Sequence, residues 1–277
     1  MPSDRAARPR PPLFRALGAD DPPAEVTVGD RTYSRSEIYK HDSWAATAVY
    51  ADDSGERIVC KFNRVKSVCG IPMAWLGRRL AAREAAALTR LSDLPLFPRA
   101  LGPVFAGGRR QWNAVARSYI AGHPLGASER VGSRFFAELR ASLLAMHARG
   151  IAYVDLHKRE NVIVGDDGRP YLVDFQICFD AASPRARNLP GARWAFERFC
   201  DADLYHLGKH VLRSDPHASV ASPPIPGWLR LHRTVAVPFR QLRRRLLVAA
   251  GIRKGRGRAV TEVFAEDAVR RESARAA

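Results

Sequence analysis

The chain has 277 residues, 46% of them hydrophobic and 26% charged, and 45 basic against 28 acidic side chains give a net charge of +17. This composition is ordinary for a globular protein, and no apolar run approaches the ~18 residues that cross a bilayer, which excludes a membrane-spanning protein. The length allows one large domain or two lobes. The four cysteines show no Cys-x-x-Cys spacing, which indicates reduced thiols in a cytoplasmic protein.

Residues 1–24 are predicted to form a disordered leader, because they are rich in Arg, Pro and Asp and lack the apolar stretch of a secretory signal. Four short strands are then predicted, separated by Gly, Asp and Ser: Glu25–Val28, Arg31–Tyr33, Ala46–Ala51 and Arg57–Phe62. Side chains alternate along a strand, so Lys61 is expected on the face opposite Cys60 and Phe62.

A long helix is predicted from Met73 to Leu91, and one stripe of it holds Leu76, Leu80, Glu84, Leu88 and Leu91. A carboxylate in an apolar stripe is rare unless it is paired, and Lys61 is the expected partner of Glu84. Strands resume at about Gly102–Ala106 and Gln111–Ile120. A second helix is expected over Arg134–Arg149, with Ser133 as its N-cap and Gly150 as its end.

Two polar clusters follow this helix, each beside one of the apolar runs Val162–Val164 and Tyr171–Val173. Asp155 and Asn161 precede the first run and Asp174 follows the second. Gly165–Gly168 is a tight-turn sequence, so the runs are expected to form a hairpin that brings Asn161 and Asp174 to the same end. Two carboxylates and an amide can hold a divalent metal and orient a hydroxyl, as phosphoryl transfer requires. The alternative is that these residues only form turns, which is common for Asp and Asn at strand ends.

The C-terminal part of the chain carries much of the positive charge. A helix is predicted over Asp201–Arg213, and residues 222–277 are read as a Pro-rich linker followed by a basic tail. Residues 230–277 hold thirteen Lys and Arg against four Asp and Glu. Within the tail, Pro238–Ala250 predicts a basic amphipathic helix, which suits either an anionic membrane surface or packing on the protein with a solvated arginine face. Nucleic-acid binding ranks third, because no known binding motif accompanies the charge.

The order of the polar residues resembles the protein-kinase-like phosphotransferase superfamily over roughly residues 35–213. Lys61 resembles the strand lysine that holds nucleotide phosphates, and Glu84 resembles its helix partner. Ser118 and Ile120 lie in a segment that looks like the hinge that meets adenine through backbone groups. Asp155 matches the catalytic-loop aspartate, and Asn161 and Asp174 match the metal ligands. Asp203 resembles the helix aspartate that braces the catalytic loop; the alternative is an acid in the first turn of a helix, favoured by the helix dipole.

The resemblance implies an α+β, bilobal protein-kinase-like fold, with a small, mostly antiparallel β N-lobe at residues 25–118 and a short, mainly helical C-lobe at residues 119–221. It also implies ATP and Mg²⁺ as cofactors and transfer of the γ-phosphate to a hydroxyl. The chain is most similar to small atypical bacterial members of the RIO-like and lipopolysaccharide-core kinase types. The expected acceptor is therefore an envelope sugar or lipid-linked saccharide at the cytoplasmic membrane face. The alternatives are an atypical serine/threonine protein kinase and a pseudokinase scaffold.

Four features depart from the family pattern. Six positions separate Asp155 from Asn161 where the family has five, so either the loop bulges by one residue or Glu160 takes the place of the metal ligand. Asn161 is preferred, because a strand follows it and its distance along the sequence to Asp174 fits the family pattern. Tyr153 stands where the family usually has His, and Gln176 replaces the glycine that follows Asp-Phe. Residues 40–47 take the place of the Gly-rich loop without its glycines. The changed loop favours the scaffold alternative, whereas the three intact residues Lys61, Asp155 and Asp174 favour an enzyme.

Overall fold

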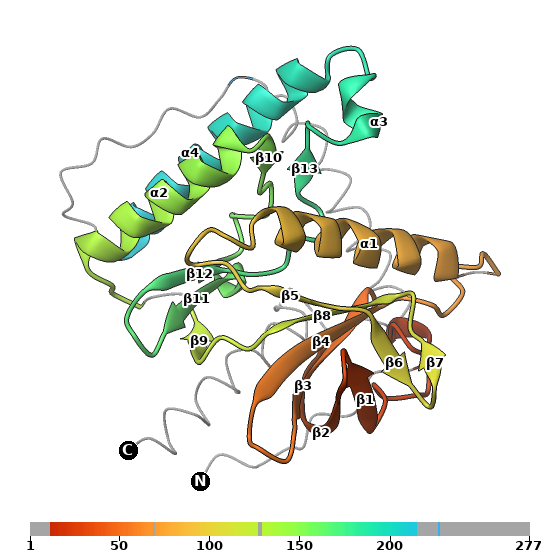
Figure 1. Cartoon of the computed structure of the whole chain (residues 1–277). Helices are drawn as coiled ribbons and strands as arrows, with labels where there is room; N and C mark the ends of the chain where they lie inside the picture. Colours follow the sequence, from red (N-terminus) through yellow and green to blue (C-terminus); the bar gives the residue numbers. More distant parts are fainter. Residues whose placement is uncertain (1–11, 69, 127–128, 215–226, 228–277) are drawn as a thin grey trace, which may run out of the picture. The chain divides into compact units, whose positions relative to one another are not determined.

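The structure, a computed structural model, describes residues 12–68, 70–126, 129–214 and 227 (Figure 1). The chain divides into two compact units, one formed by residues 1–86 and 99–119 and the other by residues 87–98 and 120–277. The first unit is an antiparallel sheet with a helix, and the second is mainly helical with two small sheets. The predicted α+β class is therefore confirmed. The linker at residues 222–227 lies outside the described residues except for Gly227, and the helix expected at Pro238–Ala250 lies wholly outside them.

The first unit is built on eight strands in the order β5-β8-β4-β3-β2-β1-β6-β7, and all neighbours are antiparallel. Their bounds are β1 Glu25–Val28, β2 Arg31–His41, β3 Ala45–Ala51, β4 Arg57–Asn63, β5 Ala100–Gly102, β6 Val104–Ala106, β7 Arg109–Arg110 and β8 Ala114–Ser118. Alternation along β4 places Ile58, Cys60 and Phe62 in one buried cluster. β2 extends past the predicted Tyr33, because its polar second half pairs with β3 through two register shifts.

Helix α1, Ala74–Arg90, falls within the predicted Met73–Leu91. Its buried positions include Ala81, Glu84 and Leu88, which recur at the three- and four-residue spacing of one helix face. Gly77 is fixed by packing, because a Cβ at this position would lie 2.3 Å from the carbonyl oxygen of Arg64. The helix therefore begins in close contact with the chain that leaves β4.

Residues 12–24 differ from the predicted disordered leader. They include a 3-10 turn, η1 Pro12–Phe14, and Ala16 is fully buried. The N–H of Ala16 donates to the carbonyl of Asp42 at 2.7 Å, and its carbonyl accepts from the N–H of Val65 at 3.1 Å. The few apolar residues of this Arg- and Pro-rich segment are sufficient to attach it to the sheet, with Leu17 packed against the core cluster. Residues 1–11 lie outside the described residues.

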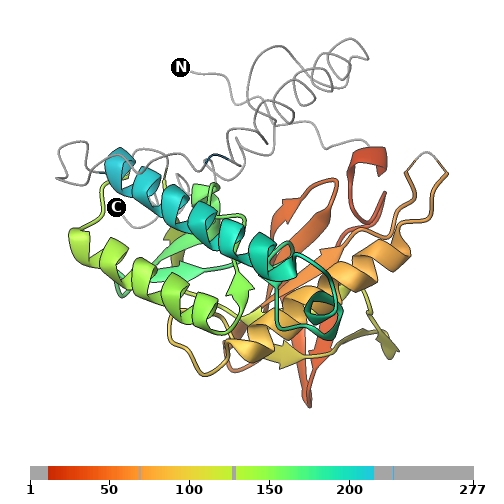
Figure 2. The same ribbon diagram turned by 90° about the horizontal axis from the view of Figure 1, so that it is seen from above.

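The second unit contains two long helices, α2 Ser133–Ala148 and α4 Ala192–Ser214, which lie side by side (Figure 2). Its strands and short helices are β9 Gly122–Pro124, β10 Ile151–Ala152, η2 Arg159–Asn161, β11 Val162–Gly165, β12 Pro170–Leu172, β13 Phe179–Asp180 and α3 Pro184–Arg187. β11 pairs with both β12 and β9, and β10 pairs with β13. The predicted hairpin after Asn161 is thus confirmed. Among the described residues, no helix combines the length and hydropathy that a membrane crossing requires.

Two helix boundaries correct the sequence expectations. The N-cap of α2 is Gly132, with no side-chain cap, and Ser133 is already the first helical residue. Helix α4 begins at Ala192 instead of Asp201. Its first turns lie near the surface, with Trp194 exposed, so no regular apolar stripe marks them in the sequence.

Candidate active site

In the first unit, Lys61 of β4 and Glu84 of α1 form a buried ion pair. The Lys61 Nζ lies 3.0 Å from the Glu84 Oε2, and the two side chains are 10% and 1% exposed. Strand alternation turns Lys61 away from Cys60 and toward the buried stripe of α1, which carries Glu84. The pairing expected from the sequence is therefore present, and it places an ammonium group at a defined position of the sheet.

The two expected hinge residues lie where the first unit ends. Ser118 closes β8: its N–H donates to the carbonyl of Arg99 and its Oγ accepts from the N–H of Arg99, both at 2.9 Å. These groups are thus engaged within the sheet. Ile120 is the first residue of the second unit on this side. Adenine contact through Ser118 and Ile120 stays a prediction.

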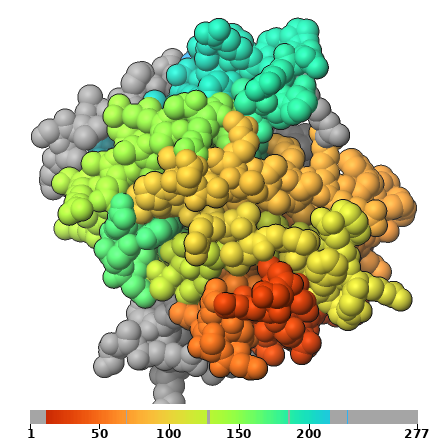
Figure 3. Space-filling model, in the orientation of Figure 1, coloured from red at the N-terminus to blue at the C-terminus, as the bar shows by residue number. Residues whose placement is uncertain are grey.

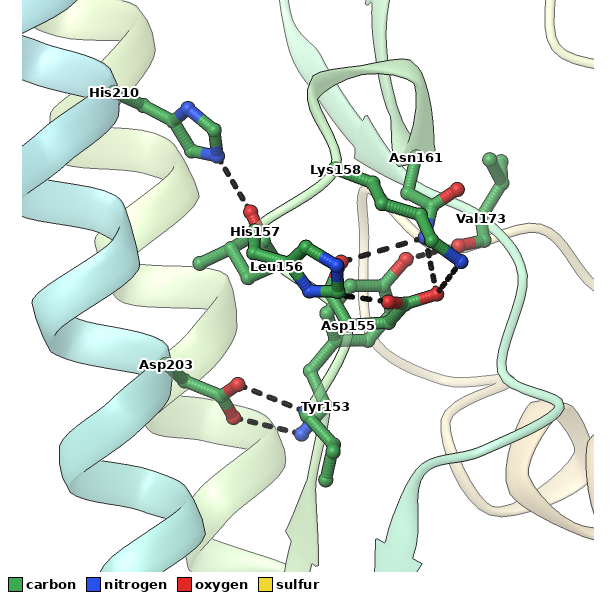
Figure 4. A network of polar contacts seen from close by, with 10 residues as sticks. Tyr153, Asp155, Leu156, His157, Lys158, Asn161, Val173, Asp203 and His210 are labelled. Carbon is green, nitrogen blue, oxygen red and sulfur yellow. Dashed lines mark hydrogen bonds and ion pairs between the residues drawn. The ribbon is translucent and has the colours of Figure 1, made fainter. Parts of the chain in front are cut away.

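In the second unit, Asp155 is the centre of a polar cluster (Figure 4). Its side chain is 3% exposed. The Asp155 Oδ2 accepts from the Nδ2 of Asn161 at 3.0 Å and from the Nζ of Lys158 at 2.6 Å. The Asp155 Oδ1 lies 3.2 Å from the Nδ1 of His157. The loop therefore brings Asn161 to Asp155 despite the longer spacing between them.

The extra loop residue is taken up by η2. The N–H of Asn161 donates to the carbonyl of Lys158 at 3.3 Å, which closes a single tight turn. Glu160, the alternative ligand, is exposed, whereas Asn161 is 5% exposed. Of the two, Asn161 is the one hydrogen-bonded to Asp155.

Lys158 is a member of this cluster that the sequence did not single out. Burial disfavours its ammonium, but the hydrogen bond and charge of Asp155, together with the charges of Asp174 and Glu160, outweigh burial and raise the pKa of Lys158. An ammonium bonded to the Asp155 carboxylate is a local source of positive charge. The sequence offers little indication of this role for Lys158, because a lysine three positions after an aspartate is common on any loop or helix.

Asp174 follows β12 in the left-handed region of backbone space, with φ of 65°. Two contacts fix the place of Asp174 in the hairpin. Val162 pairs with Leu172, and the Val173 N–H donates to the carbonyl of Asn161 at 3.0 Å. Asn161 and Asp174 thus lie at the same end of the hairpin, as expected. A non-glycine residue at positive φ stores strain, which recurs at functional sites.

Asp203 braces the start of the loop that carries Asp155. From the middle of α4 its carboxylate accepts from the N–H of Tyr153 at 2.7 Å and of Val154 at 2.8 Å, and it lies 3.0 Å from the Nε2 of His147. Burial raises the pKa of Asp203, and these hydrogen bonds oppose the rise. Val154 has a φ of 71°, a strained value for a β-branched residue. Asp203 is therefore not an acid of a first helical turn, because α4 begins at Ala192.

Tyr153 joins the loop that carries Asp155 to the segment that carries Asp174. Its fully buried hydroxyl donates to the carbonyl of Val173, the residue before Asp174. Its ring packs edge-on against Phe175 at 5.3 Å between centroids. On the other side of the loop, the Nε2 of His210 donates to the carbonyl of Leu156 at 2.5 Å. The backbone around Asp155 is thus held from both flanks.

The comparisons with known proteins give limited matches. No family model matches the chain. A stretch of 49 residues, 17% of the chain, is 49% identical to the serine/threonine-protein kinase WAG1 of Arabidopsis thaliana and spans 10% of that protein.

Two solved structures with similarity are Rio2 kinases from Chaetomium thermophilum. The Rio2 kinase-ADP/Mg²⁺-phosphoaspartate complex has a TM-score of 0.48 at 17% identity, covering 89% of this chain and 71% of that chain. A second Rio2 structure has a TM-score of 0.47 at 17% identity, covering 89% and 73%. The pairing of the strand lysine Lys61 with the helix glutamate Glu84, and the bond between Asp155 and Asn161, are contacts that the resemblance of the sequence to protein-kinase-like phosphotransferases leads one to expect.

Proposed function

We propose that the protein is an ATP- and Mg²⁺-dependent phosphotransferase that moves the γ-phosphate to a hydroxyl group. The observation that carries the proposal is the buried Asp155 carboxylate, bonded to Asn161 and Lys158 on one loop. Phosphoryl transfer needs little covalent chemistry from the protein; it needs a positioned hydroxyl and compensation of phosphate charge. This loop supplies a carboxylate for the first task and a cation for the second.

Each side chain has a task in this proposal. Asp155 accepts a hydrogen bond from the attacking hydroxyl and orients it. Lys158 compensates negative charge on the phosphoryl group beside Asp155. Lys61 binds the α- and β-phosphates, and Glu84 holds the ammonium in position.

Asn161 and Asp174 would hold Mg²⁺, which supplies charge neutralisation to the phosphates when it is bound. Amide and carboxylate oxygens are the hard ligands that this ion prefers. The described residues contain no group of three or more His, Cys, Asp or Glu arranged for a metal. The charge of Asp174 already helps to raise the pKa of Lys158, so this end of the hairpin attracts cations.

The acceptor that we propose is a sugar hydroxyl of an envelope or lipid-linked saccharide at the cytoplasmic membrane face. Its support is the resemblance of the sequence to small atypical bacterial members of the RIO-like and lipopolysaccharide-core kinase types. Transfer to a protein serine or threonine is the alternative, and the short stretch similar to WAG1 favours it. A scaffold without turnover is the third reading, supported by the missing glycines at residues 40–47.

The test is phosphate transfer from labelled ATP to envelope glycolipid or to cell protein. We expect Asp155→Asn to lower turnover by about 10²- to 10⁴-fold, the usual contribution of a positioned acid or base, while ATP still binds. Asp166→Asn is the matched control, because Asp166 is an exposed acid on the hairpin turn. Turnover equal to that of the wild type in Asp155→Asn would remove Asp155 from this role, and ATP binding without turnover in the wild type would favour the scaffold.

A further inference from the structure

The first unit exposes a group of large apolar side chains, which we call the tryptophan patch: Leu13, Trp44, Val65, Val68, Ile71 and Trp75, with the basic residues Lys66, Arg78 and Arg79. It holds six of the eleven exposed large hydrophobic side chains among the described residues. Trp44, Ile71 and Trp75 are 51%, 60% and 58% exposed. Single exposed apolar residues are normal, but their concentration in one short region marks an interaction surface.

The patch is a built surface, because one buried arginine ties its segments together. Arg64 is 3% exposed. Its guanidinium donates to the carbonyls of Leu13 at 3.0 Å, Ser43 at 2.6 Å and Lys66 at 2.8 Å. Its backbone N–H donates to the carbonyl of Trp44 at 2.9 Å. Three stretches of chain that carry the exposed apolar residues are thus held around one cation.

The surroundings of the patch are basic. Residues 64–83 contain five Lys and Arg and no Asp or Glu. Trp75, Arg78 and Arg79 stand at the spacing that places them on one face of α1, and all three are exposed. The nearby acid Asp42 caps the Trp44 turn and pairs with Lys40. The surface therefore combines indole and aliphatic groups with positive charge.

Part of the patch lies on an exposed turn. Val68 and Ile71 are bridged as a small turn, and both side chains are exposed. The chain that leads into α1 reaches the surface of the first unit, in orange, at the right of Figure 3 and at the upper right of Figure 2. The apolar side chains of this turn are therefore accessible to a partner.

We propose that the tryptophan patch docks the protein on an anionic phospholipid surface. Indole rings favour the boundary between lipid and water, and Lys and Arg side chains are attracted to anionic headgroups. The patch is formed by residues of the first unit, so the proposal assigns no role to the basic tail. The docking is separate from phosphate transfer, because binding to lipid needs no nucleotide.

The experiment is co-sedimentation of the full chain, without nucleotide, with vesicles of phosphatidylcholine alone or mixed with phosphatidylglycerol. We expect binding to the mixed vesicles that weakens as salt rises. Arg78→Gln/Arg79→Gln should weaken it about 30-fold, given the attraction of each basic side chain to an anionic surface. Trp75→Ser should weaken it about tenfold through lost apolar burial. Ile71→Ser is a second variant on the exposed turn, where a substitution hardly affects folding.

The matched control is Trp112→Ser/Arg109→Gln. Trp112 is a 56% exposed indole and Arg109 an exposed arginine, both outside the patch. This control should bind vesicles like the wild type. The proposal is overturned if the patch variants bind mixed vesicles as tightly as the wild type does. It is also overturned if they lose a co-purifying protein while lipid binding persists, which would make the patch a protein interface.

Discussion

Removing one hydroxyl group, in Tyr153→Phe, tests whether the loop that carries Asp155 and the segment that carries Asp174 are held in register. The buried Tyr153 hydroxyl donates to the Val173 carbonyl. Its loss leaves that carbonyl without this donor, and we expect the free energy of unfolding in urea to fall by about 1–3 kcal/mol. Asp174 is the next residue and lies at a φ of 65°. If the bond restrains this strained backbone by about 1 kcal/mol, affinity for Mg-ATP falls about fivefold.

The control for this experiment is Tyr50→Phe in the first unit. Tyr50 is equally buried, and its hydroxyl donates to the carbonyl of Pro23 at 2.8 Å. Both variants should lose similar stability, but only Tyr153→Phe should weaken the binding of Mg-ATP in titration calorimetry. Equal nucleotide affinity in the two variants would show that the Tyr153–Val173 bond does not position Asp174.

Two further predictions concern buried ionisable groups. Lys61→Met leaves Glu84 buried without its lysine and should lower the free energy of unfolding by about 3–5 kcal/mol. The double variant Lys61→Met/Glu84→Met should regain most of that stability without regaining ATP affinity. Thermal melts with and without ATP check both expectations, and a double variant as unstable as the single one would contradict them. Burial lowers the pKa of His210 to about 4. Because the folded protein favours neutral His210, the stability that depends on its neutral form is complete above the unfolded pKa of about 6.5 and is lost as pH falls toward 4. The free energy of unfolding should therefore drop by about 3 kcal/mol over this range, and the drop should be smaller in His210→Gln. Equal pH profiles of the two proteins in urea titrations would show that His210 does not cause the drop.

The sequence predicted the elements that are continuous apolar runs or repeat with the period of a helix. β3 and β4 are buried along most of their length and end at turn residues, and the apolar positions of α1 recur at helical spacing, so their positions and the pairing of Lys61 with Glu84 could be inferred. The hairpin from Asn161 to Asp174 was also predictable, because a turn sequence separates two apolar runs. In each case the local pattern and the tertiary environment agree.

The features that escaped prediction depend on contacts between distant segments. Residues 12–14 and Ala16 are placed by bonds to Asp42 and Val65, which no local pattern reveals. The early start of α4 lacks a regular apolar stripe, since its first turns lie near the surface. Val154, which has a positive φ, donates its N–H to Asp203, 49 positions away. A residue in a strained backbone conformation is set by its tertiary partners, and its own sequence neighbourhood gives no sign of it.

The most direct measurement is the magnesium dependence of ATP binding to the wild type, Asp174→Asn and the exposed control Asp166→Asn, by titration calorimetry with and without Mg²⁺. We expect Mg²⁺ to tighten binding in the wild type and in Asp166→Asn, and to have little effect in Asp174→Asn, because that variant lacks the carboxylate that holds the ion beside the phosphates. The same gain from Mg²⁺ in all three proteins would contradict the assignment of Asp174 as a metal ligand and with it the proposed phosphotransfer site.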